Sequence, residues 1–253
     1  MKKNIKAIIA AVSASIMCAV PVAASFASTA ATGITAEAYY TDWATSPAIC
    51  YVAQAAPGLP SNYVTANALV YQLNNSNNTA MLTGKSSTDA EDIVLPDIIK
   101  YNGKLYKITS VKADSFYGST AVLSFKGGKY LELIDSRAFA NSSCTSVEVN
   151  SRAITVREEA FSRANLRSVK LPAKATVKTR AFRDNAGLQT VDFICNDSTN
   201  YNTAVNLDRT AFRNCTSLTR VNAENRRMLN LYRSTFNNCP CVGFYGFSLN
   251  YYD

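Results

Sequence analysis

One short motif recurs along most of the chain and limits the folds that it can adopt. It consists of a phenylalanine preceded by a small residue, with an aliphatic residue five positions upstream and a spaced, mostly apolar pair downstream. Successive copies lie 23, 22, 21, 30 and 24 residues apart. The phenylalanines of the six copies are Phe116, Phe139, Phe161, Phe182, Phe212 and Phe236.

A repeat of this length is typical of a solenoid, in which each coil stacks on the next. A single unit cannot bury its own apolar face, but stacked units cover one another. The alternation in SVEV, SVKL and TVDF indicates one short, half-buried strand per coil. We therefore expect a parallel sheet of short strands, with the phenylalanines inside as structural core and a small residue beside each to make room.

Two segments carry the motif most clearly: VREEAFSRANLRSVKLP from residue 156 and LDRTAFRNCTSLTRV from residue 207. They resemble the BspA-like leucine-rich repeat, also called the Treponema pallidum type, and the resemblance covers about residues 91–247. It implies a β-rich leucine-rich-repeat solenoid with little helix and an N-terminal β-hairpin cap. Two features depart from the pattern. Cys144 replaces an aliphatic residue, and the last copy reads CPCVGFYGF, as in a cap or a degenerate coil.

The interval of 30 residues after Phe182 contains an insertion, CNDSTNYNTA, that is polar and rich in turn formers. We expect it to leave the solenoid as a surface loop. The N-terminus combines a basic start, an apolar run and small residues, which is the pattern of a secretory signal peptide. Cleavage is possible after Ala24, Ala27 or Ala38, and Ala38 is favoured. The alternative is an N-terminal membrane anchor.

The expected organisation follows from these boundaries. It comprises a signal peptide over residues 1–38, an irregular lead-in over 39–63, a capping hairpin region over 64–106, six repeats over 107–247 and a C-terminal tail over 248–253. The signal peptide predicts a secreted or cell-surface protein that meets the membrane only through that segment. The sequence leaves the mode of surface attachment open.

Six cysteines remain after the expected cleavage: Cys50, Cys144, Cys195, Cys215, Cys239 and Cys241. An even number in an exported chain permits disulfides, and none of the spacings is typical of a metal site. Cys215 and Cys239 each lie three residues after a repeat phenylalanine, and the resemblance makes that position a buried turn position. Equivalent positions of neighbouring coils are close enough to be bridged, but the sequence does not settle the thiol state.

Catalysis is not expected. The chain has no histidine, which removes the commonest general base and the imidazole metal ligand. The carboxylate pair Glu158–Glu159 lies on a turn, where neighbouring side chains point to different faces. No glycine-rich phosphate-binding loop is found. We therefore predict no enzymatic activity, no cofactor and no bound metal.

Two columns of side chains form the candidate binding surface. The first lies between the buried strand positions and alternates in sign, so it is more consistent with a structural charge ladder than with a ligand site. It comprises Lys126, Glu148, Lys170, Asp192 and Asn222. The second lies in the basic half of the repeats, where an anionic polymer would be attracted. It comprises Arg157, Lys178, Arg180, Arg209 and Arg233.

A flat, extended surface of this kind suits a protein or a glycan. The resemblance implies an extracellular interaction role, so the leading hypothesis is protein binding or adhesion through the repeats. The alternative is a non-catalytic carbohydrate-binding accessory protein, suggested by the 14 tyrosines and the ending FYGFSLNYYD. Nucleic acid is not expected, because the aromatic residues are not interleaved with the basic ones for base stacking.

Overall fold

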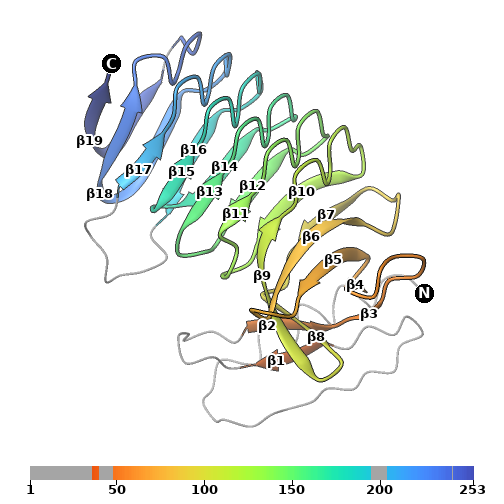
Figure 1. Cartoon of the computed structure of the whole chain (residues 1–253). Helices are drawn as coiled ribbons and strands as arrows, with labels where there is room; N and C mark the ends of the chain where they lie inside the picture. The colour runs from red at the N-terminus through yellow and green to blue at the C-terminus, as the bar shows by residue number, and fades with distance from the viewer. Residues whose placement is uncertain (1–35, 40–47, 195–203, 241) are drawn as a thin grey trace, which may run out of the picture.

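The computed structural model describes residues 36–39, 48–194, 204–240 and 242–253. Within these residues every regular element is a strand, as the sequence predicted. Figure 1 shows the coils stacked in a row, with the N-terminal strands at one end and β19 (Gly243–Tyr252) at the other. The part of the chain that the structure describes holds no helix that could cross a lipid bilayer.

An antiparallel meander covers the N-terminal end of the solenoid. Its four strands are β3 (Gln54–Ala55), β4 (Tyr63–Ala66), β5 (Leu69–Asn74) and β6 (Thr79–Lys85). A hairpin of two antiparallel strands then leads into the first coil, and a further antiparallel pair lies beside it. These strands are β8 (Ile98–Tyr101) with β9 (Lys104–Val111), and β1 (Ala36–Tyr39) with β2 (Ala48–Val52). β2 also pairs with β8, in the parallel sense.

The predicted parallel sheet is the first of two ladders. Its inward positions hold buried residues on successive coils, including Phe125, Val147, Val169 and Val191. The first ladder starts with five short strands, one from each successive coil. They are β7 (Glu91–Val94), β10 (Val122–Gly127), β12 (Ser146–Val149), β14 (Ser168–Pro172) and β16 (Thr190–Ile194). The ladder continues through the first parts of β18 (Arg220–Tyr232) and β19.

A second parallel ladder was not predicted. The sequence indicated one strand per coil, but the aliphatic residue before each phenylalanine belongs to a second strand. The ladder begins at β6 and β9 and continues through β11 (Leu133–Ile134), β13 (Ile154–Val156), β15 (Ala175–Val177) and β17 (Ala204–Leu207). The later parts of β18 and β19 complete it, so these two long strands join both ladders. The middle strands are two or three residues long, too short to show a period in the sequence.

The phenylalanines lie on turns that link the second ladder of one coil to the first ladder of the next. Their rings stack in one column, with neighbouring centroids 4.9 to 5.3 Å apart and planes within 12° of parallel. The first five rings are buried, whereas Phe236 in the last turn is partly exposed. Backbone hydrogen bonds also join the turns, such as Phe139 N to the Ala160 oxygen at 2.7 Å.

Left-handed backbone closes these turns at the residue two positions after each phenylalanine and, in the first five turns, also at the residue two positions before it. These residues have φ between 55° and 65°, and Gly118 is the only glycine among them. The residues before the ring are Asp114, Arg137, Glu159, Arg180 and Thr210, and those after it are Asn141, Arg163, Asp184, Asn214 and Asn238. The tight turns therefore present polar side chains in register on the surface.

The structure corrects two expectations about the ends of the chain. The lead-in expected to be irregular over residues 39–63 contains β2 and β3. The tail expected over residues 248–253 lies mostly in β19, which pairs with β18. Most of the expected signal peptide lies outside the described residues, as do residues 195–203 of the predicted loop.

Candidate binding surface

The first column of predicted site residues lies on the outer face of the first ladder. The strand register places Lys126 beside Glu148, Glu148 beside Lys170, Lys170 beside Asp192 and Asp192 beside Asn222. Lys126 Nζ lies 3.0 Å from Glu148 Oε1, and Asn222 Nδ2 donates a hydrogen bond to Asp192 Oδ1. The hydrogen bond from Lys126 is the main cause that lowers the pKa of Glu148 below its ordinary value.

A hydroxyl column runs beside this charged column. Ser124, Ser146, Ser168 and Thr190 lie in register, and Arg220 continues the row on β18. We call the two columns together the first-ladder face. Its members are Ser124, Lys126, Ser146, Glu148, Ser168, Lys170, Thr190, Asp192, Arg220 and Asn222.

Apolar and aromatic side chains border the first-ladder face at both ends. Leu123 lies at the start of β10 with 42% of its surface exposed. Tyr245 continues the charged column on β19, is 55% exposed, and has the Arg220 guanidinium 5.5 Å from its ring centroid. The face therefore combines a polar centre with exposed apolar groups at its edges.

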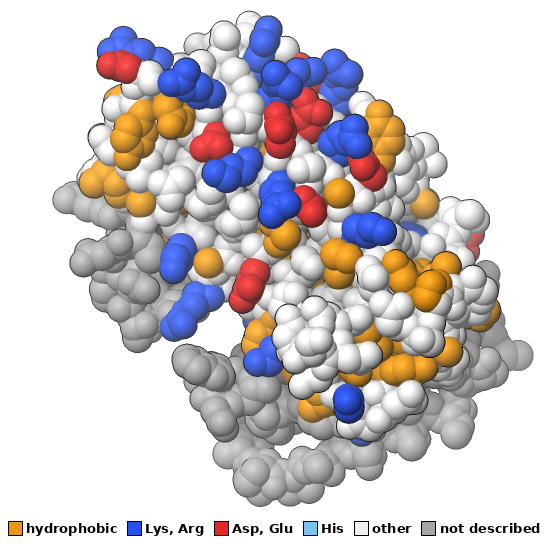
Figure 2. All heavy atoms as spheres, in the orientation of Figure 1, with side chains coloured by type: hydrophobic (Ala, Val, Ile, Leu, Met, Phe, Trp, Pro, Cys, Tyr) orange, Lys and Arg blue, Asp and Glu red, His pale blue; other side chains and the backbone are white. Residues whose placement is uncertain are grey.

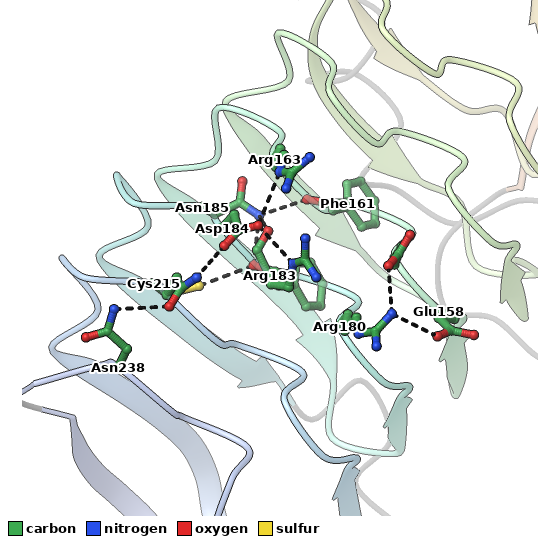
Figure 3. Close-up of polar contacts among 12 residues, drawn as sticks. Glu158, Phe161, Arg163, Arg180, Arg183, Asp184, Asn185, Cys215 and Asn238 are labelled. Atoms are coloured by element: carbon green, nitrogen blue, oxygen red, sulfur yellow. Dashed lines mark hydrogen bonds and ion pairs between the residues drawn. The ribbon is translucent and has the colours of Figure 1, made fainter.

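The second column of predicted site residues lies on the turns, and its cations are already paired. Arg157 Nη1 is 3.1 Å from Asp135 Oδ1, and Lys178 Nζ is 3.6 Å from Asp208 Oδ2. Arg180 Nη1 lies 3.2 Å from an oxygen of Glu159 and 3.9 Å from one of Glu158, as Figure 3 shows for Arg180 and Glu158. In each of these pairs the acid comes from a neighbouring coil.

The two remaining cations of that column share one partner at the C-terminal end. Arg209 Nη2 donates to the main-chain oxygen of Asp253 at 2.8 Å, and Arg233 Nε lies 3.1 Å from Asp253 Oδ1. The Arg209 guanidinium also lies 4.8 Å from the Tyr232 ring centroid. Each of the five cations of this column therefore has a partner within the chain.

Sequence reasoning missed a cluster around Asp184. Arg183 Nε and Arg163 Nε lie 2.8 and 3.2 Å from Asp184 Oδ2, and both side chains point toward it in Figure 3. Asn214 Nδ2 donates to Asp184 Oδ1 at 2.6 Å and accepts from Asn238 at 3.0 Å. Partial burial acts to raise the pKa of Asp184, but these hydrogen bonds outweigh it and hold that pKa below its usual value.

A buried asparagine fixes the inside of the same turn. Asn185 Nδ2 donates to the main-chain oxygens of Phe161 and Phe182 at 2.8 and 2.9 Å, and its Oδ1 accepts from Leu166 N at 3.2 Å. Asn185 is 1% exposed, so its role is structural. Polar residues recur two and three positions after the phenylalanines, but this recurrence alone does not place the side chains around Asp184 together.

The arrangement of charges is that of a mixed surface. Figure 2 shows Lys and Arg side chains interspersed with Asp and Glu over the repeats, with hydrophobic side chains gathered near the N-terminal strands and at the opposite end of the solenoid on the visible face. Among the described residues no group of three or more His, Cys, Asp or Glu side chains could hold a metal ion. The site can therefore present complementary charges and hydrogen-bonding groups over an extended face.

Family comparison agrees with this geometry. The model of the BspA type leucine rich repeat region, which spans six copies, matches residues 99–204 and 196–244. The chain belongs to this family. BspA-type proteins are generally non-catalytic, and their repeats point to a protein-binding or surface protein. No protein of curated function was found to match the chain.

Solved structures of other proteins share the fold. The leucine-rich repeat protein of T. pallidum is 20% identical, with a TM-score of 0.57 over 74% of this chain and 82% of that chain. The pneumococcal vaccine antigen PcpA is 16% identical, with a TM-score of 0.57 over 74% of this chain. The present chain spans 50% of the PcpA chain. At these identities the likeness establishes the solenoid fold alone.

Proposed function

We propose that this BspA-type protein is a non-catalytic extracellular or cell-surface protein that binds another protein through the first-ladder face. The observation that carries the proposal is the register of that face, where side-chain columns run unbroken across five coils. Solenoids use such extended surfaces to bind other molecules. The turn surface is less suited, because its cations are engaged with acids of neighbouring coils.

The composition of the first-ladder face supports a protein partner. Interfaces between proteins are enriched in aromatic residues and arginine relative to the rest of the protein surface. The end of the face near β19 offers Arg220 over Tyr245, and Lys170 extends from its centre as an exposed cation. The alternating charges of the column give a partner a specific electrostatic pattern to match.

The test is a binding screen followed by matched variants. The secreted chain is screened against arrays of extracellular matrix proteins, cell-surface proteins and glycans. A face variant, Lys170→Gln with Arg220→Gln, is compared with a turn variant, Lys112→Gln with Arg213→Gln, which changes the net charge equally at exposed turn positions. We expect the face variant to weaken protein binding about tenfold or more. Equal weakening by the turn variant would contradict the proposed surface.

The β19 strand favours carbohydrate binding as a second candidate. Tyr245, Tyr251 and Tyr252 are 55%, 54% and 43% exposed, and exposed tyrosines can stack on sugar rings. The rings of Tyr232 and Tyr252 are tilted by 42°, so this pair does not offer one flat platform. Glycan binding that Tyr251→Ala abolishes, in the absence of any protein partner, would favour this second function.

Export is part of the proposal and has its own test. The basic start, apolar run and small residues before Ala38 support secretion through a cleaved signal peptide. N-terminal sequencing of protein collected outside the producing cell should find a new end near Tyr39. Protein that stays in the cytoplasm at full length would contradict this part.

A further inference from the structure

Two cysteine side chains lie one above the other on the last two turns. The turns that carry Cys215 and Cys239 are joined by backbone hydrogen bonds, from Phe212 N to Thr235 O at 3.0 Å and from Asn214 N to Asn237 O at 2.9 Å. The two cysteines also close their own turns identically, because each main-chain nitrogen donates to the phenylalanine oxygen three residues earlier. Positions 215 and 239 are therefore equivalent positions of adjacent coils.

The two thiols have the same direction as well as the same position. Cys215 Sγ donates to the main-chain oxygen of Phe182 at 3.2 Å, and Cys239 Sγ donates to that of Phe212 at 3.0 Å. Both side chains thus point back toward the preceding coil along one line. Both are thiols in the structure, Cys215 fully buried and Cys239 partly exposed.

We propose that Cys215 and Cys239 form a site of disulfide modification that links the last two coils. Adjacent strands of a sheet lie about 4.8 Å apart. That spacing falls within the range of about 4.4 to 6.8 Å that separates the Cα atoms of a disulfide. The bond therefore forms with small adjustments of the two side chains and leaves the hydrogen bonds between the turns in place.

The partly exposed thiol is the one that reacts first with an external oxidant, a low-molecular-weight disulfide. The Cys239 thiolate attacks one sulfur of the oxidant, which breaks its S–S bond and releases one thiol. The Cys215 thiolate then attacks the Cys239 sulfur of this mixed disulfide and releases the second thiol. Two protein S–H groups are oxidised to one S–S bond while one oxidant disulfide is reduced to two thiols.

The acidities of the two groups fit this order. Contact with the Cys215 thiol lowers the pKa of Cys239 from its ordinary value. Contact with Cys239, together with burial, raises the pKa of Cys215. Cys239 therefore supplies the reactive thiolate at the surface, and Cys215 becomes the resolving group once the mixed disulfide has formed beside it.

The position of the bond gives it a structural consequence. β19 is the last strand of both ladders, and within the described residues it pairs only with β18. Coils at the end of a solenoid lack a neighbour on one side and open first. A disulfide between residues 215 and 239 ties the turn before β19 to the preceding coil, so the end of the solenoid is held closed.

The experiment treats the full folded chain with oxidised glutathione and maps the products by tryptic digestion and mass spectrometry. Cys215 lies in peptide 214–220, and Cys239 lies with Cys241 in peptide 234–253. Fragmentation before Pro240 separates the last two cysteines. In the wild type and in Cys241→Ser, we expect peptide 214–220 to be linked to peptide 234–253 through Cys239. In Cys239→Ser this link should be lost. Linkage of Cys215 to Cys241, or no linkage in folded protein, would overturn the proposal.

Thermal unfolding of the same samples tests the consequence. The oxidised wild type should melt about 5 to 10 °C above the reduced protein, since the bond closes a loop of moderate length. Cys239→Ser should melt at one temperature in both conditions, and Cys241→Ser should behave as the wild type does. Cys239 is only partly buried, so the serine variant is expected to fold. An oxidised protein that melts no higher than the reduced one would refute the closing role.

Discussion

The ring of Phe139 lies flat against that of Phe161, with centroids 4.9 Å apart and planes only 1° from parallel. This separation is close to the distance of about 4.8 Å between neighbouring strands of a sheet. The ladders thus set the rise per coil, and the rings follow it. Each of the four inner phenylalanines is packed between two identical neighbours, which makes the column continuous through the core.

Loss of one ring from the middle of this column should be costly. In Phe182→Ala the rings of Phe161 and Phe212, whose centroids lie 5.3 and 5.1 Å from that of Phe182, lose their common neighbour. We expect the free energy of unfolding to fall by about 3 to 5 kcal/mol, because a buried cavity replaces the ring. Urea denaturation measures the difference. The matched control is Phe236→Ala at the partly exposed end of the column, which should lower the free energy of unfolding clearly less. Equal decreases in the two variants would contradict the expectation that the buried ring contributes more.

Asn185 gives a second prediction about the inside of the turns. Asn185→Ala leaves the Leu166 main-chain nitrogen without its side-chain acceptor and removes one donor from the Phe161 and Phe182 oxygens, of which the Phe182 oxygen keeps the Cys215 thiol. Each unsatisfied buried group costs about 1 to 3 kcal/mol. Asn185→Cys should cost less than Asn185→Ala, because Cys215 at the equivalent position donates to the oxygen of the preceding phenylalanine. Thermal unfolding of both variants compares them, and an alanine variant as stable as the cysteine variant would exclude this role.

Asp184 should make stability depend on pH in the acid range. Its folded-state pKa lies below the usual value because hydrogen bonds from Asn214, Arg183 and Arg163 outweigh its partial burial. The stabilisation is therefore fully present above the unfolded-state pKa, near 3.9, and is lost as the pH falls through the folded-state pKa. Asp184→Asn should lower the free energy of unfolding by about 1 kcal/mol at pH 7. Its stability should fall less steeply in acid than that of the wild type, and parallel curves would contradict this.

Thr210 marks a strained position in a turn. Its φ of 57° is left-handed, although a β-branched residue rarely adopts that conformation. Thr210→Asn should raise the free energy of unfolding by about 1 kcal/mol, since asparagine tolerates left-handed backbone better. The control is Asn141→Thr, at the other left-handed position of an earlier turn, which should lower stability. Thermal melts measure both variants. If their melting temperatures shift in the same direction, backbone strain is ruled out as the cause.

The main features of the solenoid were accessible from the sequence because each coil repeats them in phase. The interval between Phe139 and Phe161 gave the coil length, and the family model confirms the repeat type. The columns of the first-ladder face could also be predicted. A parallel ladder in register brings residues one coil apart together, so Lys126 and Glu148 become neighbours by their spacing alone.

Other features depended on details that a period does not contain. The strand Ile154–Val156 in the second ladder is three residues long. In the sequence, so short a strand looks the same as an isolated core residue. The partners of the turn cations were present in the same column, since Asp135 stands one coil before Arg157. Counting net charge over a long segment concealed that pairing. The Asp184 cluster depends on left-handed turn geometry that places side chains two positions after the ring in one row.

The most direct test of the proposed surface is hydroxyl-radical footprinting of the complex with the extracellular protein that binds in the screen. Leu123 and Tyr245 are exposed at the two ends of the first-ladder face, whereas Tyr117, which is 55% exposed, lies on the first repeat turn. The proposed surface predicts that the partner protects Leu123 and Tyr245 from oxidation and leaves Tyr117 unchanged. Protection of Tyr117 with no change at Leu123 and Tyr245 would place the partner on the turns and contradict it.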